Sequence, residues 1–203
     1  MNVLWQCPED AVAALVLAHG AGAGMRHRNM QAIADAFART GIATLRFDFP
    51  FIERGRSRPD SQAVATEAVA RAFAAARERT ELPLWLGGHS FGGRMASHAV
   101  LDRALDPEGL IFCSFPLHAP GKRETGRAAH LQSIEKPMLF LSGTRDAFAD
   151  RALLEGVVAA LPSARIHWLA MADHGYRVLR RERRAEESVF DEMARVARAF
   201  ICA

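Results

Sequence analysis

Short apolar runs alternate with helix-forming segments along the whole chain, and this alternation limits the folds open to it. Seven apolar runs, many of them next to glycine or proline, predict buried strands, the first at a sheet edge. In chain order they are Val3–Trp5, Val12–Ala18, Ile42–Phe47, Leu84–Gly87, Leu110–Cys113, Met138–Leu141 and Ile166–Leu169. Helical periodicity predicts helices at Asn29–Arg39, Gln62–Arg79, Phe91–Leu105, Arg151–Leu161 and Arg184–Ile201. This order predicts an α/β fold, with a doubly wound, mostly parallel sheet of about 6–7 strands and helices on both faces.

Length and composition fit one globular domain. The chain has 203 residues, half of them hydrophobic, and no linker or repeat divides it, so residues 1–203 predict a single domain with a substantial core. No apolar run reaches the roughly 18 residues that a membrane helix needs, and no secretory signal is visible. Three widely spaced cysteines, Cys7, Cys113 and Cys202, suggest no disulfide framework. We expect a cytoplasmic protein with no membrane partner; the sequence gives no support for a homo-oligomer and leaves the oligomeric state open.

The charge pattern gives limited information about partners. The formal net charge is +3, and the densest basic cluster is Arg177–Arg184. Such a cluster could attract an acidic substrate or a nucleic-acid backbone. Acidic residues lie within and beside it, at Glu182, Glu186 and Glu187, and no aromatic residues interleave its arginines as in single-strand binders. We therefore interpret the cluster as a solvated segment and expect no nucleic-acid partner.

The stretch Leu86–Arg94, LGGHSFGGR, places one serine between glycines at an expected strand-to-helix turn. Gly88, Ser90 and Gly92 fit the pattern G-x-S-x-G of a nucleophile elbow. The glycines are needed because a Cβ at either position would strike a neighbouring strand or helix. The turn lifts the Ser90 Oγ above the sheet, and the N-terminus of the following helix favours negative charge there. Ser90 is therefore the candidate nucleophile.

A serine nucleophile needs a base, and the base needs an acid that orients it. In this architecture the acid and the histidine follow the serine in chain order, each in a loop at the carboxyl end of a strand. Asp146 follows the run PMLFLSG, and His174 follows the run RIHWLA. Both residues stand where the order requires them, so we predict a triad of Ser90, Asp146 and His174.

Acyl transfer also needs backbone N–H groups that bind an oxyanion. One donor is expected at Phe91, directly after the nucleophile, and the other at Ala21, in the glycine-rich stretch HGAGAG. That stretch does not match a phosphate-binding loop, because no Gly-Lys-Ser/Thr ending follows and G-x-G-x-x-G is not in register. The remaining histidines show no metal-ligand spacing. We expect no cofactor and no metal.

Four further residues are candidates for substrate contact: His89, Phe115, Leu117 and His118. The last three lie in the segment Ser114–Gln132 and are expected to form part of the rim. A loop-stabilising role for His118 is an equally good interpretation. Because the segment has room only for a loop and a short helix, we expect an open site without a substantial lid. Such a site favours small or externally anchored substrates.

Several polar residues near these positions are expected to have structural roles. Asp150 is expected to cap the helix that follows it, and Asp173 to occupy a turn beside the candidate base. Asp48 ends an earlier strand, where it is expected to neutralise Arg94. His19 is expected to brace its loop through hydrogen bonds rather than to take part in catalysis.

Taken together, these motifs resemble a serine-type α/β-hydrolase, similar to the compact dienelactone-hydrolase-like members. More narrowly, the stretches HGAGAGMRHRNM, LRFDFPF, GGHSFGGRMAS, SFPLHAPGK, SGTRDAF and ADHGY resemble a bacterial group. That group is related to a testis-expressed hydrolase-like protein and to a chromatin-complex subunit of animals. The resemblance covers essentially the whole chain. Dienelactone hydrolases proper use a cysteine where this chain has Ser90, so their lactone substrate is not implied.

The residues and the resemblance together predict a cofactor-free serine hydrolase that cleaves a small carboxylic ester or thioester through an acyl-enzyme. The same triad could instead serve an acyltransferase or a perhydrolase, which acyl transfer to an alcohol or to peroxide would distinguish. A third alternative is a catalytically silent binding or scaffold module. The complete set of three chemical groups argues against that reading. The sequence indicates neither the acyl group nor the leaving group.

Overall fold

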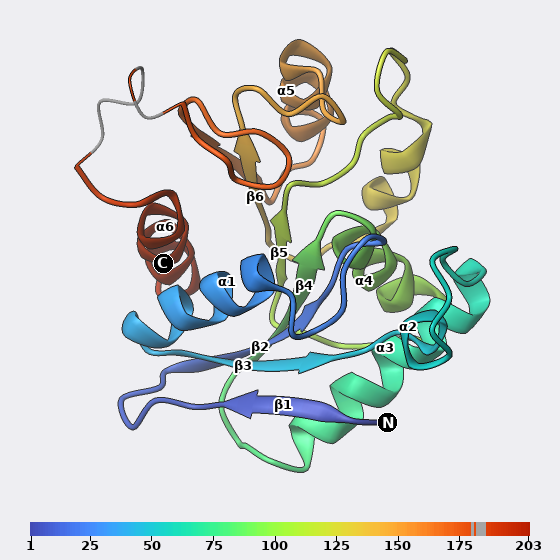
Figure 1. The fold of residues 1–203 in the computed structure, drawn as a ribbon, viewed down its shortest axis with the longest axis vertical. Helices are drawn as coiled ribbons and strands as arrows, with labels where there is room; N and C mark the ends of the chain where they lie inside the picture. The colour runs from blue at the N-terminus through green and yellow to red at the C-terminus, as the bar shows by residue number, and fades with distance from the viewer. Residues whose placement is uncertain (180, 182–185) are drawn as a thin grey trace.

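Seven strands form a sheet in the computed structural model, which describes residues 1–179, 181 and 186–203 (Figure 1). The strands are β1 (Val3–Gln6), β2 (Ala13–Ala18), β3 (Ile42–Phe47), β4 (Leu84–His89), β5 (Leu110–Cys113), β6 (Met138–Gly143) and β7 (Ala164–Leu169). Their order across the sheet is β1-β3-β2-β4-β5-β6-β7. Strand β1 is antiparallel to β3, and all other neighbouring pairs are parallel. The expected mostly parallel sheet is confirmed, with β1 as an edge strand.

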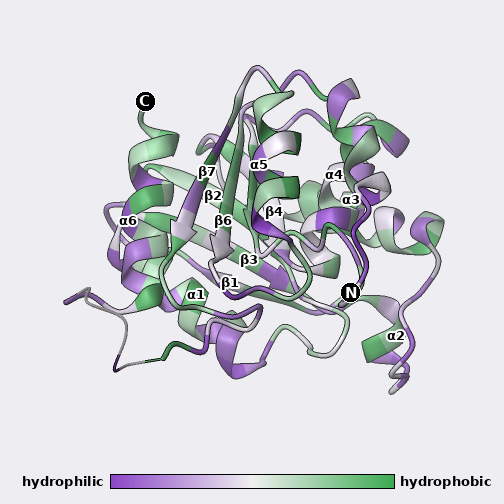
Figure 2. Ribbon diagram, turned by 90° about the horizontal axis from the view of Figure 1, so that it is seen from above, coloured by the Kyte–Doolittle hydropathy of each residue, from purple (hydrophilic) through white to green (hydrophobic). Residues whose placement is uncertain are grey.

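Helices cover both faces of this sheet (Figures 1 and 2). One face carries α1 (Arg28–Arg39) and α6 (Val189–Ile201), which contact each other. The opposite face carries α2 (Pro50–Glu53), α3 (Gln62–Arg77), α4 (Phe91–Asp102), the 3-10 segment η1 (Gly126–Ser133) and α5 (Arg151–Ala159). The predicted doubly wound arrangement is therefore confirmed. The segment expected to hold only a loop and a short helix contains η1.

Helix α6 begins later than the sequence analysis expected. The predicted start at Arg184 lies outside the described residues, and residues 186–188 precede the helix without belonging to it. Ser188 caps α6, because its hydroxyl accepts a hydrogen bond of 3.1 Å from the amide of Asp191. The cap fixes the start of the helix at Val189.

Strand β2 shows why the apolar runs are continuous rather than alternating. All six of its residues are buried. Ala14, Val16 and Ala18 pack in the core beneath α3 and α4, whereas Leu15 and Leu17 pack in the core beneath α1 and α6. Successive side chains of a strand point to opposite faces, and here both faces are covered. Figure 2 shows the same hydrophobic character along the central strands.

The turn between β4 and α4 has the conformation of a nucleophile elbow. Ser90 has φ 52° and ψ −119°, a region that L residues rarely occupy, and its amide donates to the carbonyl of Cys113 at 2.9 Å. A Cβ at Gly88 would lie 2.3 Å from the Ala18 carbonyl oxygen, and one at Gly92 would lie 2.4 Å from the same atom. The glycines are thus required by the close approach of the elbow to the end of β2.

We expect Gly92→Ala to lower the free energy of unfolding by about 3 kcal/mol, because the new methyl group would overlap backbone atoms that cannot rotate away. The Cβ would also lie 2.5 Å from the His19 carbonyl oxygen. Gly156→Ala in α5 is the matched control, since no atom lies within 4 Å of its Cβ position. This control should raise stability by about 0.5–1 kcal/mol. Urea denaturation of both variants would measure the effects, and equal stability would contradict the packing account.

Candidate active site

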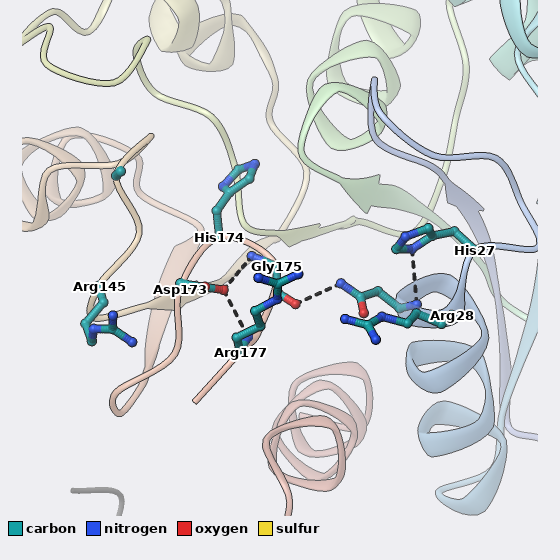
Figure 3. A pocket seen from close by; sticks show the side chains of 9 residues that line it. His27, Arg28, Arg145, Asp173, His174, Gly175 and Arg177 are labelled. Carbon is teal, nitrogen blue, oxygen red and sulfur yellow. Dashed lines mark hydrogen bonds between the residues drawn. The ribbon is translucent and has the colours of Figure 1, made fainter. Parts of the chain in front are cut away.

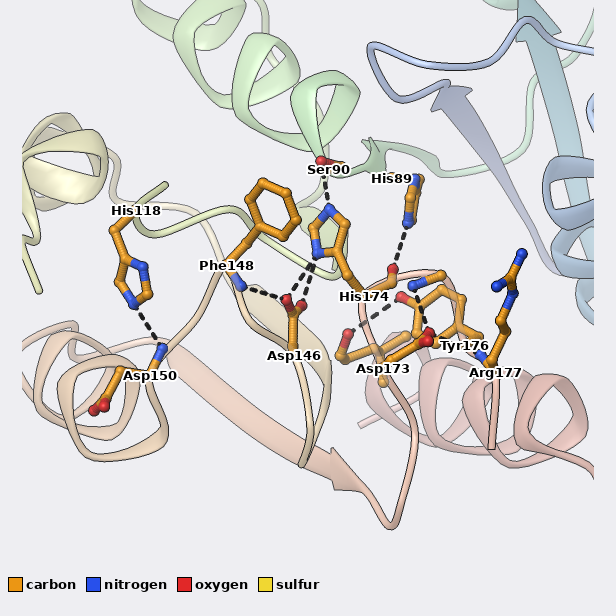
Figure 4. A network of polar contacts seen from close by, with 12 residues as sticks. His89, Ser90, His118, Asp146, Phe148, Asp150, Asp173, His174, Tyr176 and Arg177 are labelled. Atoms are coloured by element: carbon orange, nitrogen blue, oxygen red, sulfur yellow. Dashed lines mark hydrogen bonds and ion pairs between the residues drawn. The ribbon is translucent and has the colours of Figure 1, made fainter. Parts of the chain in front are cut away.

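Ser90, His174 and Asp146 lie in one chain of hydrogen bonds at the carboxyl ends of β4, β7 and β6 (Figure 4). The Ser90 Oγ is 2.8 Å from His174 Nε2. His174 Nδ1 is 2.8 Å from Asp146 Oδ2 and 2.9 Å from Oδ1. An ionised carboxylate accepts only, so Nδ1 carries the proton and donates, which leaves Nε2 to accept from the serine hydroxyl. This arrangement can draw a proton from Ser90 as its oxygen attacks an electrophile.

Asp146 is held rigidly for the role of orienting acid. Its side chain is 0% exposed, and its Oδ1 accepts a second hydrogen bond of 2.8 Å from the amide of Phe148. The nearby Asp150 is engaged elsewhere, because its Oδ1 accepts from the amide of Leu153 at 3.1 Å and so caps α5. The cap expected at Asp150 is confirmed, and Asp146 is the carboxylate in contact with His174.

Asp173 is a turn residue, as expected. Its Oδ1 accepts hydrogen bonds of 2.9 Å from the amides of both Gly175 and Arg177. These two bonds shape the backbone on either side of His174, and Asn29 of α1 donates from Nδ2 to the Gly175 carbonyl at 2.8 Å. Asn29 was not predicted as a site residue, because it lies 146 positions from Gly175 and no local sequence pattern predicts a contact over that separation.

Two aromatic rings position the imidazole of His174. Phe148 packs on it with ring centroids 4.3 Å apart and an interplanar angle of 32°. On the other side, His89 Nε2 donates to the backbone carbonyl of His174 at 2.9 Å. Burial lowers the pKa of His89 to about 4, so this ring is neutral near pH 7. Phe148 was not predicted as a site residue, although its position two residues after Asp146 was a usable signal.

A hollow of about 340 Å³ opens beside the Ser90 hydroxyl, and we call it the Ser90 hollow. Its lining includes His89, Ala21 and the glycines on either side of Ala21. The amide of Phe91 is at the first position of α4, where a helix leaves N–H groups without an intrahelical acceptor. Within the described part of the chain, neither the Ala21 amide nor the Phe91 amide donates to a protein acceptor. Both donors are therefore available to bind an oxyanion.

The expected rim contacts of Phe115 and Leu117 are not formed. Their side chains are 1% and 0% exposed, and the Phe115 ring packs against Phe112 and Phe140 in the core, with centroids 5.1 and 5.8 Å away. Ser114, the residue before Phe115, has a φ of 57°, in the left-handed region of the backbone map. Neither side chain can touch a substrate in this conformation.

His118 is also buried, with 4% of the residue exposed. Its Nδ1 donates to the Ala119 carbonyl at 2.9 Å, and its Nε2 accepts from the amide of Asp150 at 2.8 Å. These bonds tie the segment after β5 to the start of α5. The structure supports the loop-stabilising interpretation of His118 and does not support substrate contact by this residue.

The expected ion pair between Asp48 and Arg94 is absent. Asp48 Oδ1 accepts instead from the amide of Met25 at 2.7 Å, which anchors the end of the glycine-rich loop. His19 Nε2 lies 3.6 Å from the same oxygen and accepts from the amide of Phe49 at 3.0 Å. The bracing role expected for His19 is confirmed. Burial lowers the pKa of Arg94, and so does the charge of Arg127.

Some sequence features fall partly outside the described residues. Of the basic cluster Arg177–Arg184, residues 180 and 182–184 are not described.

In the described ranges, no group of three or more His, Cys, Asp or Glu side chains is placed to hold a metal ion. None of the helices in those ranges is both long enough and apolar enough to cross a membrane.

Comparisons with known proteins agree with this fold. The model of the family described as "Alpha/beta hydrolase domain" matches residues 11–202. The ferulic acid-bound structure of Est1E from Butyrivibrio proteoclasticus is similar with a TM-score of 0.75 at 15% identity, over 100% of this chain and 96% of that one. Dienelactone hydrolase from Anabaena variabilis is similar with a TM-score of 0.74 at 18% identity, over 98% and 90%.

A third similar structure is XC6422 from Xanthomonas campestris, described as an α/β serine hydrolase without a lid. Its TM-score is 0.69 at 20% identity, over 98% of this chain and 87% of that one. At these identities the likeness concerns the fold, whereas the family match covers nearly the whole sequence. The expectation of an α/β-hydrolase is confirmed, and the chain belongs to the alpha/beta hydrolase domain family.

Proposed function

We propose that the protein hydrolyses a small carboxylic ester or thioester through an acyl-enzyme on Ser90. The observation that carries the proposal is the continuous chain of hydrogen bonds from the Ser90 Oγ through His174 to the buried Asp146. The serine at a strained elbow, the base and the orienting acid are the three parts that acyl transfer by a serine needs. The family membership agrees with a hydrolase, and so does the similarity to XC6422, which is described as an α/β serine hydrolase.

In the first half-reaction, the Ser90 Oγ attacks the carbonyl carbon while His174 Nε2 takes the hydroxyl proton. The carbonyl oxygen becomes an oxyanion that the amides of Ala21 and Phe91 bind. Asp146 stays ionised and stabilises the imidazolium through its bonds to Nδ1. The bond to the leaving oxygen or sulfur then breaks, and Nε2 returns the proton to that atom.

In the second half-reaction, water takes the place of the leaving group. His174 Nε2 removes a proton from the water as its oxygen attacks the acyl carbon. Collapse of the second tetrahedral intermediate breaks the bond to the Ser90 Oγ, which regains a proton from Nε2. The products are a carboxylic acid and the free serine.

The size of the site supports a small acyl group. The Ser90 hollow of about 340 Å³ lies at the lower end of the range for small-molecule pockets. The segment after β5 contributes η1 and buried side chains rather than a cover over the site. Within the described residues, no segment encloses a long acyl chain.

The test is to mix the protein with aryl acetates and acetyl thioesters, quench in acid and measure intact mass. We expect a transient mass gain of one acetyl group on Ser90, followed by release of acetate. If an added alcohol or peroxide takes most of the acetyl group in place of water, the protein is an acyltransferase or a perhydrolase instead. If no acetyl group is transferred to Ser90 from any of these donors, the proposal is wrong.

A further inference from the structure

A second hollow, of about 360 Å³, adjoins the Ser90 hollow. Figure 3 shows the residues that line this second hollow. The two share His27, Asn29 and His174 in their linings. The imidazole of the candidate base therefore stands at the boundary between them. A substrate whose carbonyl lies at Ser90 could extend past His174 into this second space.

Three arginines from separate parts of the chain line this second hollow, which we call the arginine hollow. Arg28 is the first residue of α1, Arg145 directly precedes the candidate acid, and Arg177 follows the candidate base by three positions. All three are exposed. Among the described residues of the lining Asp173 is the only carboxylate, and the formal charges of Asp173 and the three arginines sum to +2. One oxygen of Asp173 already accepts two backbone amides.

No described carboxylate occupies these guanidinium groups. In the described part of the chain, none of the three forms an ion pair, and Arg145 donates only one long hydrogen bond of 3.4 Å, to the Met171 carbonyl. Six other arginines are paired with carboxylates: Arg39, Arg54, Arg103, Arg123, Arg151 and Arg195. Three unpaired guanidinium groups around one concave space favour an anionic ligand, because each can donate to carboxylate or phosphate oxygens.

The position of His174 indicates which part of the substrate would lie there. In the proposed reaction Nε2 of His174 protonates the leaving group, so the leaving group must lie on the imidazole side of the scissile bond. The arginine hollow is on that side, since it shares His174 with the Ser90 hollow but is not lined by Ser90 itself. The acyl group would remain in the Ser90 hollow, among Ala21, Ala23 and Met30.

We infer that the arginine hollow binds an anionic substituent, a phosphate or a carboxylate, on the leaving alcohol or thiol. This inference rests on the proposed function, and it names the class of ester or thioester that the site selects. An anion there would lie among guanidinium groups that no described carboxylate occupies, and charge-assisted hydrogen bonds are stronger than neutral ones. It would also draw substrate toward Ser90 at low ionic strength.

The test compares three acetyl esters of meta-substituted phenols whose substituent is a carboxylate, a phosphate monoester or a neutral carboxamide. At low salt we expect kcat/KM for either anionic ester to exceed that for the carboxamide by about tenfold. The ratio should fall toward one in Arg145→Gln/Arg177→Gln and in high salt, because exposed charges are screened. The larger of the two anionic ratios identifies phosphate or carboxylate as the preferred group.

Arg71→Gln is the matched control, because Arg71 is an exposed arginine on α3 outside both hollows. Its ratio should equal that of the unaltered protein. A ratio near one in the unaltered protein at low salt would overturn the inference while leaving ester hydrolysis itself intact. A second measurement is independent of turnover: titration calorimetry of Ser90→Ala with phenyl phosphate. Binding that the two arginine substitutions weaken supports the hollow as an anion site, and no binding at millimolar phenyl phosphate overturns it.

Discussion

Replacing Ser90 with alanine is expected to lower kcat for ester hydrolysis by at least about 10⁴-fold, because the variant has no oxygen to form the acyl-enzyme. Any residual rate would come from the oxyanion donors and from binding alone. The loss should not come from unfolding. Among the described residues, the Ser90 hydroxyl bonds only to His174. The bond from the Ser90 amide to the Cys113 carbonyl is unaffected by the substitution. Alanine removes a single oxygen and leaves the turn residues on both sides in place.

The control for this variant is Ser61→Ala. Ser61 precedes α3, is exposed and makes no side-chain capping bond, so the same substitution there should change neither kcat nor the melting temperature. Both variants should be measured on the same aryl acetate with circular dichroism of each sample. If folded Ser90→Ala protein hydrolyses the ester at the unaltered rate, the nucleophile is another residue.

Asp146→Asn is expected to lower kcat by about 10³- to 10⁴-fold with a small change in KM. An asparagine amide has nearly the shape of the carboxylate, but it carries no charge and can donate a hydrogen bond. Donation to His174 Nδ1 would leave the ring proton on Nε2, where it can no longer accept the serine proton. The Phe148 amide can still bond to the side-chain oxygen, so the loop should keep its conformation.

Asp150→Asn is the matched control, four positions further along the same loop. Asparagine is an equally good helix cap, so the bond from the Leu153 amide should be retained. The ion pair of Asp150 with the exposed Arg123 would be lost at a cost of less than about 1 kcal/mol. Its kcat should be unchanged. If both variants lost the same activity, the effect would be on the loop and not on the base.

Most of the fold could be predicted from local patterns. Continuous apolar runs are typical of parallel strands covered on both faces, and Ile42–Phe47 and Leu110–Cys113 have the predicted bounds. The relative positions of Ser90, Asp146 and His174 followed from one rule, that loops at the carboxyl ends of parallel strands meet at one edge of a sheet. The structure places these three side chains in contact.

The placement of other side chains depends on long-range contacts that local sequence patterns do not predict. Phe115 and Leu117 were expected at the surface because they follow a strand that ends near the site, yet both are buried, in a segment that begins with a positive φ at Ser114. Asp48 was expected to neutralise Arg94 because of its charge and its place at the end of an earlier strand, whereas its carboxylate accepts a hydrogen bond from the Met25 amide. The choice between those partners depends on where a loop from an earlier part of the chain passes.

The most direct test of the account is covalent labelling with a small fluorophosphonate, followed by intact mass and mapping of the modified residue. We predict one label per chain, on Ser90, absent in Ser90→Ala and greatly slowed in His174→Ala, with Ser61→Ala labelled as fast as the unaltered protein. Such labelling requires a serine activated by a base but no knowledge of the substrate. Folded protein that takes up no label, or that is labelled equally well after Ser90→Ala, would contradict the central claim that Ser90 is the nucleophile.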